Sequence, residues 1–587
     1  MKLVTAMVQP EVVPLVQEEL FGAQISKFSI TAGVGHGTQK GYQATFRGVQ
    51  TQVNILKRVR IDVAVNEDFV ERAVQASSGR RRRACRATGR SSSPTSTTAS
   101  GSGPASAARR PSASRSMSLR DVRRVIQDRK IKFVDFRFTD LLGGWRHISY
   151  AIEAFDEDMF VHGIGFDGSS VRGFQGIERS DMLLRPDPDS GFIDPFYEEP
   201  TLVFICNVKD PVDLSLYSRD PRNIVEKATR FLETSALADT CYVGPEAEFY
   251  IFDDVRFDQT VNEAFYYVDS GIGAWNVGRV EKPNLGHKPG LKQGYFRMPP
   301  TDPYQDVRSQ MLTNLRDCGV DAELHHQEVG SGGQCEIGIK YTTIGQMADA
   351  MMKFKYIVKN TANRHGRTAT FMPKPLFGDN GSGMHCHMSL WRKGKNLFYD
   401  PNGYAGLSEA GVFFIGGILK HASSLCAFTC PTANSYRRLV PGFEAPNKLV
   451  YSRSNRSAAV RIPMYSAAPG AKRIEFRCPD PSANPYLAFS AIMMAGFDGI
   501  VNRIVPPDPV DQDLYELPEE ELRKIGDTPP TLKAALNALE EDHEYLVRGD
   551  VFTPDVIDTW IRYKRANELA YMDQRPHPAE FALYYDC

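Results

Sequence analysis

Three short segments place one functional residue at position i and a second at i+2. They are Glu246-Ala247-Glu248, His385-Cys386-His387 and Glu475-Phe476-Arg477. In a β-strand, residues i and i+2 project from the same face, so each pair would direct two polar groups into one cavity. Two neighbouring carboxylates repel each other unless a cation or a proton lies between them. Glu246 and Glu248 are therefore candidate metal ligands, although a solvated strand edge would show the same spacing.

Two further acids, Glu328 and Glu336, flank a turn that contains Gly330, Gly332 and Gly333. The two strands that such a turn joins can bring both carboxylates back to one side. Carboxylates with one imidazole and no paired thiolates suit Mg²⁺ or Mn²⁺ better than zinc. The adjacent residues His325 and His326 would look the same as ordinary polar strand residues, so neither is predicted as a ligand.

Basic residues are concentrated in one segment near these acids. They are Arg437, Arg438, Arg453, Arg456, Arg461, Lys472, Arg473 and Arg477. The planar fork of arginine can clamp carboxylate or phosphate oxygens, so this density beside a carboxylate site indicates phosphoryl transfer. For any single one of these residues, a charged surface position is the alternative.

Sequence patterns predict the elements that position these groups. Ser118 is a candidate N-cap for a helix that carries Leu119 and Val122 on one face. A strand is predicted over residues 134–138, and a helix over 347–365 that ends at Gly366. Within residues 1–76, strands at 3–8 and 59–65 and a helix at 13–20 form a small α+β pattern.

The composition is ordinary for a soluble protein, with 587 residues, 42% hydrophobic residues and a net charge of -1; it allows globular enzyme chemistry and excludes wholesale disorder. Residues 77–116 contain nine arginines and no acidic residue, which leaves -10 for the rest of the chain. This segment has almost no large apolar side chain, so a disordered linker is predicted and specific nucleic-acid binding is not. Ten cysteines without a CxxC pair indicate reduced thiols in a cytoplasmic protein. No export signal or membrane span is predicted.

Six motifs occur in order between residues 117 and 587. They are Gly-Phe-Asp-Gly-Ser-Ser at 165–170, Gly-Pro-Glu-Ala-Glu-Phe at 244–249, Asn-Gly-Ser-Gly-Met-His-Cys-His-Met-Ser at 380–389, Arg-Leu-Val-Pro-Gly-Phe-Glu-Ala-Pro at 438–446, Asn-Arg-Ser at 455–457 and Arg-Ile-Glu-Phe-Arg at 473–477. Together they resemble type I glutamine synthetase. The resemblance implies that ATP phosphorylates the side-chain carboxylate of L-glutamate and that ammonia then displaces phosphate to give L-glutamine.

The resemblance also implies a role for each matching residue. Two Mg²⁺ (or Mn²⁺) ions per active site would be held, one near glutamate by Glu248, Glu328 and Glu336, and one among the ATP phosphates by Glu246, His385 and Glu475. Glutamate would be bound by Asn380, Gly381, Arg438 and Arg477, and the nucleotide by His387, Ser389, Arg456 and Arg473. The catalytic residues would be Arg456, Asp167, which would bind ammonium and help remove its proton, and Glu444 on a flap over the intermediate.

An α+β fold follows from the same resemblance: a β-grasp-like domain over 117–215 and a catalytic domain over 216–587 whose sheet forms a half-barrel. Subunits would form a dodecamer of two hexameric rings, with active sites between subunits and Asp167 supplied by a neighbour. Residues 513–518 and 575–586 resemble the regulated branch of the family. Tyr515 would then be modified by an adenylyltransferase, and an ordinary loop tyrosine is the alternative.

Two positions depart from the pattern of the family. Gly470 stands where a lysine is expected five positions before the metal-binding Glu475, which removes one expected nucleotide contact. Phe443 replaces a tyrosine in the flap, a change that we expect to be mild.

Residues 1–76 resemble a truncated PII nitrogen-regulatory protein, which implies a ferredoxin-like fragment. The resemblance is carried by Met-Lys-Leu-Val-Thr-Ala at 1–6, Gly-His-Gly-Thr-Gln-Lys-Gly at 35–41, Phe-Arg-Gly at 46–48 and Arg-Val-Arg-Ile at 58–61. The Gly-Lys nucleotide loop of that family has no counterpart, and Thr51 stands at its tyrosine position. Residues 77–116 are interpreted as a frameshifted or degenerate remainder that joins a PII frame to a synthetase frame starting at Met117.

Two alternatives remain open from the sequence. A relative in the same family could ligate glutamate to a polyamine or another amine, although Asp167 and the flap favour ammonium. A PII-like regulatory protein could also carry an inactive synthetase portion, although all six proposed metal ligands are present.

Overall fold

The computed structural model describes residues 2–8, 28–35, 42–46, 49–53, 56–65, 118–443, 445–512 and 517–587, together with Val16, Leu20, Ile25 and Leu514. The chain divides into two units, Met1–Arg110 and Pro111–Cys587. The predicted linker, the Glu444 and Tyr515 positions and most of the predicted helix at 13–20 lie outside the described residues.

The first unit contains a three-stranded antiparallel sheet in the order β1 (Lys2–Val8), β5 (Leu56–Val65), β2 (Phe28–Gly35), and a hairpin of β3 (Tyr42–Phe46) and β4 (Val49–Val53). Strands β1 and β5 confirm the two predicted strands of this segment. Ile61 and Val63, two positions apart on β5, are both fully buried, as expected for the inner face of a sheet.

The second unit begins with a β-grasp-like sheet. Its strands are β6 (Phe133–Thr139), β7 (Trp145–Ala151), β8 (Ile164–Asp167), β9 (Asp181–Pro186), β10 (Phe192–Ile193) and β11 (Thr201–Lys209), in the order β7-β6-β11-β9-β8 with β10 beside β11. Helix α3 (Leu119–Asp128) precedes it, and Ser118 and Asp121 form the capping box that fixes its start. The predicted helix start at Ser118 and the predicted strand at 134–138 are both confirmed.

A larger sheet carries the residues of chemical interest. Its main path is β15 (Ala322–Gln327), β16 (Gln334–Ile339), β12 (Thr240–Phe252), β19 (Met384–Arg392), β23 (Ile474–Phe476), β22 (Ala458–Ile462) and β21 (Lys448–Arg453). The short strands β17 (Thr342–Thr343) and β18 (Thr368–Thr370) pair with β12, and β20 (Lys395–Asn396) pairs with β19. Strands β13 (Asp254–Gln259) and β14 (Ala264–Asp269) form a separate hairpin. Strand β12 pairs with β16 and β19, and β19 pairs with β23, although these partners are distant in sequence, so long-range pairing assembles the site.

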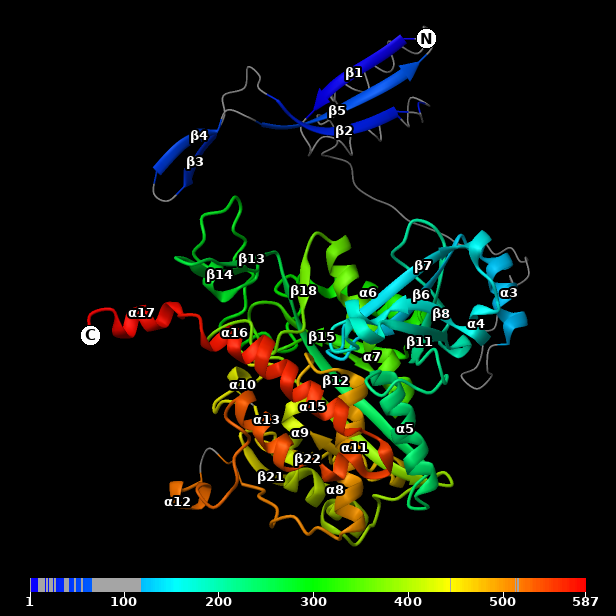
Figure 1. The fold of residues 1–587 in the computed structure, drawn as a ribbon. Helices are drawn as coiled ribbons and strands as arrows, with labels where there is room; N and C mark the ends of the chain where they lie inside the picture. The colour runs from blue at the N-terminus through cyan, green and yellow to red at the C-terminus, as the bar shows by residue number, and fades with distance from the viewer. Residues whose placement is uncertain are drawn as a thin grey trace, which may run out of the picture. The chain divides into compact units, whose positions relative to one another are not determined.

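Helices pack against this sheet and around its buried apolar core (Figure 1). They include α5 (Pro221–Thr234), α6 (Gln305–Asp317), α7 (Ile344–Arg364), α8 (Glu409–Lys420), α9 (Ala422–Thr429), α11 (Pro485–Val501), α13 (Leu532–Glu541) and α15 (Pro554–Lys564). Short helices are α4 (Met159–His162), α10 (Ser435–Arg438), α12 (Glu519–Leu522), α14 (Glu544–Val547), α16 (Ala570–Asp573) and α17 (Pro578–Tyr584). Helix α7 confirms the predicted helix, and Gly366 follows it with a φ of +68°.

In the described part of the chain, no single helix has the length and apolar character needed to cross a bilayer. The bent pair α8 and α9, which meet at 76°, passes that test by length and composition only.

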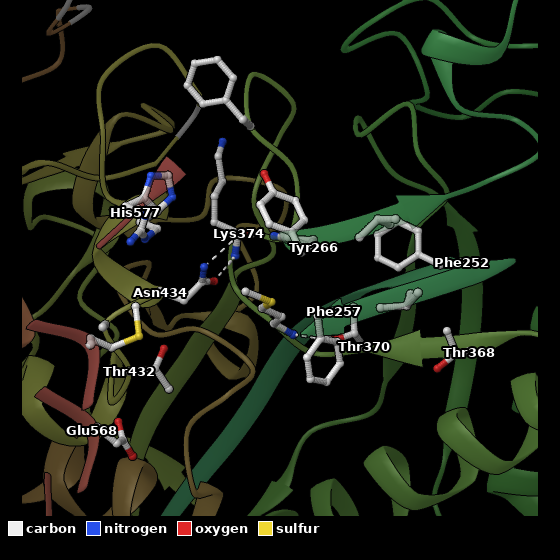
Figure 2. Close-up of a pocket in the computed structure, with 18 of the residues that line it drawn as sticks. Phe252, Phe257, Tyr266, Thr368, Thr370, Lys374, Thr432, Asn434, Glu568 and His577 are labelled. Atoms are coloured by element: carbon white, nitrogen blue, oxygen red, sulfur yellow. Dashed lines mark hydrogen bonds between the residues drawn. The ribbon is translucent and has the colours of Figure 1, made fainter. Parts of the chain in front are cut away.

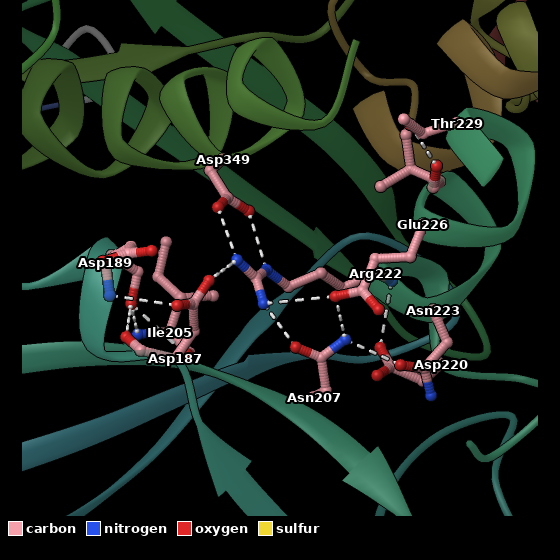
Figure 3. Close-up of polar contacts among 12 residues, drawn as sticks. Asp187, Asp189, Ile205, Asn207, Asp220, Arg222, Asn223, Glu226, Thr229 and Asp349 are labelled. Atoms are coloured by element: carbon pink, nitrogen blue, oxygen red, sulfur yellow. Dashed lines mark hydrogen bonds and ion pairs between the residues drawn. The ribbon is translucent and has the colours of Figure 1, made fainter. Parts of the chain in front are cut away.

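A buried arginine joins the β-grasp sheet to helices of the catalytic domain. Arg222 on α5 forms an ion pair with Asp187 beyond β9 at 2.5 Å and with Asp349 on α7 at 2.9 Å, and it also donates to Asn207 on β11 (Figure 3). Removing one partner of such a buried network leaves an uncompensated charge, so Arg222 fixes how the β-grasp sheet sits on the catalytic helices.

Candidate active site

The predicted pairs at i and i+2 lie on adjacent strands of the large sheet. Glu246 on β12 is directly opposite His385 on β19, and His387 is opposite Glu475 on β23. One oxygen of Glu246 lies 3.3 Å from His385 Nδ1, and the other lies 2.9 Å from His387 Nε2. Glu246, His385 and Glu475 can offer ligand atoms that all lie within 4.8 Å of one another. These are the three residues assigned to the metal among the ATP phosphates.

A second group forms one strand further along. Glu336 on β16 is paired with Glu248 on β12 and with His326 on β15. Ligand atoms of His326, Glu328 and Glu336 lie within 4.8 Å of one another. His326 was not predicted as a ligand. It is nevertheless two positions from Glu328, which is the same spacing that predicted the other pairs.

The second group holds more negative charge than the chain around it neutralises. Burial raises the pKa of Glu248 to about 7, although the Gly383 N–H, Arg438 and Arg477 favour its ionised form. Burial and the charge of Glu246 raise the pKa of Glu336 well above its usual range. A divalent cation would remove this repulsion, so the donor set fits a hard, oxygen-preferring metal.

The first group is already surrounded by positive or polar partners. Burial would raise the pKa of Glu246, but hydrogen bonds with His385 and His387 hold it below its usual range. Burial also opposes ionisation of Glu475, yet the neighbouring histidines and Arg477 lower its pKa to about 2. Burial and Arg477 lower the pKa of His385 to about 4, so its imidazole is neutral at pH 7 and has a lone pair for a metal.

Two arginines contact the fully buried Glu475. Arg461 Nε lies 2.5 Å from one carboxylate oxygen, and Arg477 Nη1 lies 2.6 Å from the other. Arg477 also donates to the carbonyl of Arg456 at 3.0 Å. Arg461 was noted in the basic segment but received no specific role from the sequence, because its pairing with Glu475 depends on the β22–β23 register.

The predicted nucleotide residues are grouped around β19. Arg473 Nε donates to His387 Nδ1 at 3.2 Å, and Ser389 accepts a hydrogen bond from Trp391 Nε1 at 3.0 Å. A Cβ atom at Gly470 would meet only Trp391, at 3.7 Å. The backbone at Gly470 therefore leaves room for a larger side chain beside Trp391.

The predicted glutamate-binding residues lie on three segments: the loop before β19, the end of α10 and the residue after β23. Tyr250 Oη donates to the carbonyl of Asn380 at 2.5 Å, and Gln334 links the carbonyl of Gly381 to Glu248. Arg438 donates to the carbonyls of Arg477 and Cys478 at 3.0 and 2.8 Å. The 380–381 loop is thereby tied to Glu248, and Arg438 is tied to the chain that follows β23.

Asp167 occupies the end of β8, apart from these strands in the fold. It accepts hydrogen bonds from Ser169 and Ser170, which hold its exposed carboxylate ionised by lowering its pKa. Within the described residues, none of its hydrogen bonds or ion pairs reaches the carboxylate groups. Glu444 and Tyr515 lie outside the described residues.

Two groups of carboxylate and imidazole side chains on one sheet, beside a β-grasp-like domain, can each offer ligand atoms to a metal ion, an arrangement that fits a metal-dependent enzyme. The glutamine synthetase catalytic-domain model matches residues 218–584, and the model of the glutamine synthetase beta-Grasp domain matches 130–211. The chain belongs to the glutamine synthetase family. The nitrogen regulatory protein P-II model matches residues 1–89.

Similar proteins agree over nearly their whole length. A glutamine synthetase of Mycobacterium bovis is 56% identical over 470 residues, covering 79% of this chain and 98% of that protein. A glutamine synthetase of Microchaete diplosiphon is 54% identical, covering 80% and 99%. The glutamine synthetase structure from Plasmodium falciparum superposes with a TM-score of 0.72 at 29% identity, covering 80% and 99%. A GmaS/ADP complex superposes with a TM-score of 0.66 at 29% identity, covering 79% and 99%.

These matches confirm the predicted fold and the predicted enzyme class. The activity is ATP-dependent formation of glutamine, and it is favoured over the amine-ligase and inactive-regulator alternatives.

Proposed function

We propose that Glu248, Glu328 and Glu336 bind one Mg²⁺ (or Mn²⁺) and that Glu246, His385 and Glu475 bind a second. The observation that carries this proposal is the arrangement of all six residues on or beside five adjacent strands, with the raised pKa values of Glu248 and Glu336. When bound, the two cations would neutralise phosphate charge and polarise the phosphoryl group for transfer.

The chain's own residues would orient the first step. A carboxylate oxygen of glutamate attacks the γ-phosphorus of ATP, an O–P bond forms, and the bond to the ADP oxygen breaks. Arg438 and Arg477, beside Asn380 and Gly381, would hold the glutamate. Arg456 and Arg473 would stabilise the charge on the moving phosphoryl group, with His387 and Ser389 on the nucleotide side.

The second step forms the amide. Asp167 would bind ammonium and accept its proton, because its carboxylate is held ionised by Ser169 and Ser170. The ammonia nitrogen then attacks the γ-carbonyl carbon, a C–N bond forms, the C–O bond to phosphate breaks and phosphate leaves. Glu444, on the flap, would help exclude water from the acyl phosphate.

A neighbouring subunit would supply Asp167, and we propose a dodecamer of two hexameric rings. Aromatic side chains exposed on the β13–β14 hairpin support contact with further copies; Phe257 is 78% exposed and Tyr266 is 63% exposed. The C-terminal helix α17 also exposes Leu583 and Tyr584. Such apolar surfaces are typical of interaction sites.

Adenylylation of Tyr515 by an adenylyltransferase and a cytoplasmic location complete the proposal. Adenylylation is supported by residues 513–518 and 575–586, which resemble the regulated branch of the family. Eight cysteines of the described region are buried as free thiols, which supports a reducing compartment.

A substrate panel tests this function. With ATP, Mg²⁺ and L-glutamate, the protein should release phosphate and form a product with the mass of glutamine when ammonium is supplied. Putrescine or methylamine at the same concentration should give much less product. A higher specificity constant for either amine than for ammonium would favour the amine-ligase alternative.

A further inference from the structure

Phe443, the residue before Glu444, lies between two lysines that come from distant parts of the chain. Its ring centroid is 3.8 Å from Lys292 Nζ and 3.7 Å from Lys374 Nζ. Both distances are well inside the range of cation–π attraction, which extends to about 6 Å. Lys292 also donates to the carbonyl of Gly442 at 3.0 Å, so it holds both the backbone and the ring of this segment.

Lys374 has a second set of contacts that leads to the predicted glutamate-binding residues. Its Nζ donates to the carbonyl of Asp379, next to Asn380. The Asp379 side chain accepts hydrogen bonds from the backbone N–H groups of Asn380, at 3.0 Å, and Ser331, at 2.8 Å. The ammonium group therefore bridges Phe443 and the 379–381 loop.

The backbone of Lys374 is also fixed. Its N–H donates to Asn434 Oδ1 at 2.7 Å and its carbonyl accepts from Asn434 Nδ2 at 3.0 Å, as Figure 2 shows for the labelled pair. Asn434 precedes α10, which carries Arg438. These paired bonds hold Lys374 between the Phe443 segment, the 379–381 loop and the helix of a predicted glutamate clamp.

We propose that Lys292 and Lys374 are positioning residues that fix the Pro441–Phe443 segment to the 379–381 loop through the ring of Phe443. The inference rests on the proposed function, because its consequence is the fate of the γ-glutamyl phosphate. With the segment held in place, ammonia is the nucleophile. When the segment is not held in place, water attacks the γ-carbonyl carbon, the C–O bond to phosphate breaks, and glutamate and phosphate are released.

The phenylalanine supplies a matched pair of variants. Phe443→Leu keeps an apolar side chain of similar size but removes the aromatic face, whereas Phe443→Tyr keeps that face. We expect Phe443→Leu to raise the ratio of ADP to glutamine about fivefold. This is the change that corresponds to losing about 1 kcal/mol of cation–π attraction. Phe443→Tyr should keep the wild-type ratio.

Lysine variants distinguish the loss of an ammonium group next to Phe443 from a general change in the cavity. Lys374→Met and Lys292→Met should each raise the ratio of ADP to glutamine. Lys359→Met is the control: Lys359 lines the same cavity of about 1170 Å³ as Lys374, but its ammonium group lies 5.7 Å from the ring of Phe371 instead. Its ratio should stay at the wild-type value.

The ratio is measured in the full-length protein by ADP release and by glutamine formed in the same sample, so loss of folded protein does not change it. Wild-type ratios in both Phe443→Leu and Lys374→Met would overturn the inference, as would an equal rise in Lys359→Met. Failure of the wild-type protein to form any glutamine would instead overturn the proposed function.

Discussion

The two carboxylate groups differ in how the surrounding residues balance their charge. Glu475 contacts Arg461 and Arg477, whereas burial outweighs the groups that favour ionised Glu248, and burial together with neighbouring carboxylates raises the pKa of Glu336. The chain alone therefore stabilises ionised carboxylates in one group and leaves the other dependent on added cations.

Glu475→Gln is expected to lower kcat about 100-fold or more, because it removes the charge of a proposed ligand and of the carboxylate that Arg461 and Arg477 contact. Phosphate release that depends on ammonium measures this effect. Glu409→Gln, a change in the first turn of α8, should leave kcat unchanged. Undiminished turnover in Glu475→Gln would contradict the metal assignment.

At this site, the sequence was sufficient to predict which functional residues share one face of a strand. The i, i+2 spacing in Glu246-Ala247-Glu248 and His385-Cys386-His387 was sufficient to predict two functional strands, and β12 and β19 confirm both. The contact of Arg461 with Glu475 and the place of His326 could not be predicted, because each depends on strand register set by distant pairing.

At the scale of elements, the predicted helix at 347–365 illustrates what periodicity reveals and what it omits. Its apolar stripe, with Met347, Met351 and Phe354, is buried as α7. The polar residues of the same helix could not be assigned partners from the sequence. Asp349 pairs with Arg222, and Lys355 donates to the carbonyl of Ala483 at 2.7 Å.

Lys355 gives α7 a predicted pH dependence. Burial lowers the pKa of Lys355 to about 7, against 10.5 ordinarily. Between pH 7 and 10 the unfolded chain holds a proton that the folded protein has released, so this residue makes stability rise with pH over that window. Lys355→Met should flatten the rise.

The thermal unfolding midpoint from pH 7 to 9.5, at one protein concentration, measures this contribution, which is on the order of 2 kcal/mol. Lys533→Met, at an exposed position of α13, should keep the wild-type slope. An unchanged slope in Lys355→Met would show that another group controls the pH dependence.

At the scale of the whole molecule, one chain places its ammonium-binding candidate away from its metal ligands. Asp167 belongs to the β-grasp sheet, and Glu475 belongs to the large sheet. Active sites shared between subunits would bring the two together. The sequence could predict this only through family resemblance, because no pattern within one chain encodes a contact between copies.

Mixing two inactive variants tests the shared site. Asp167→Asn and Glu475→Gln should each be inactive alone, and subunits dissociated and reassembled together should recover roughly a quarter of the wild-type activity, as expected when random neighbours complete a site. Mixing without dissociation is the control. Absence of recovery in co-assembled particles would place both residues in one subunit's site.

The most direct test of the account is transfer of oxygen from glutamate to phosphate. With L-glutamate carrying ¹⁸O in its γ-carboxylate, ATP and ammonium, we predict that each glutamine formed is accompanied by one phosphate containing one ¹⁸O atom, because the acyl phosphate C–O bond breaks when ammonia attacks the carbon. Glutamine formed with unlabelled phosphate, or no glutamine at all, would contradict the account.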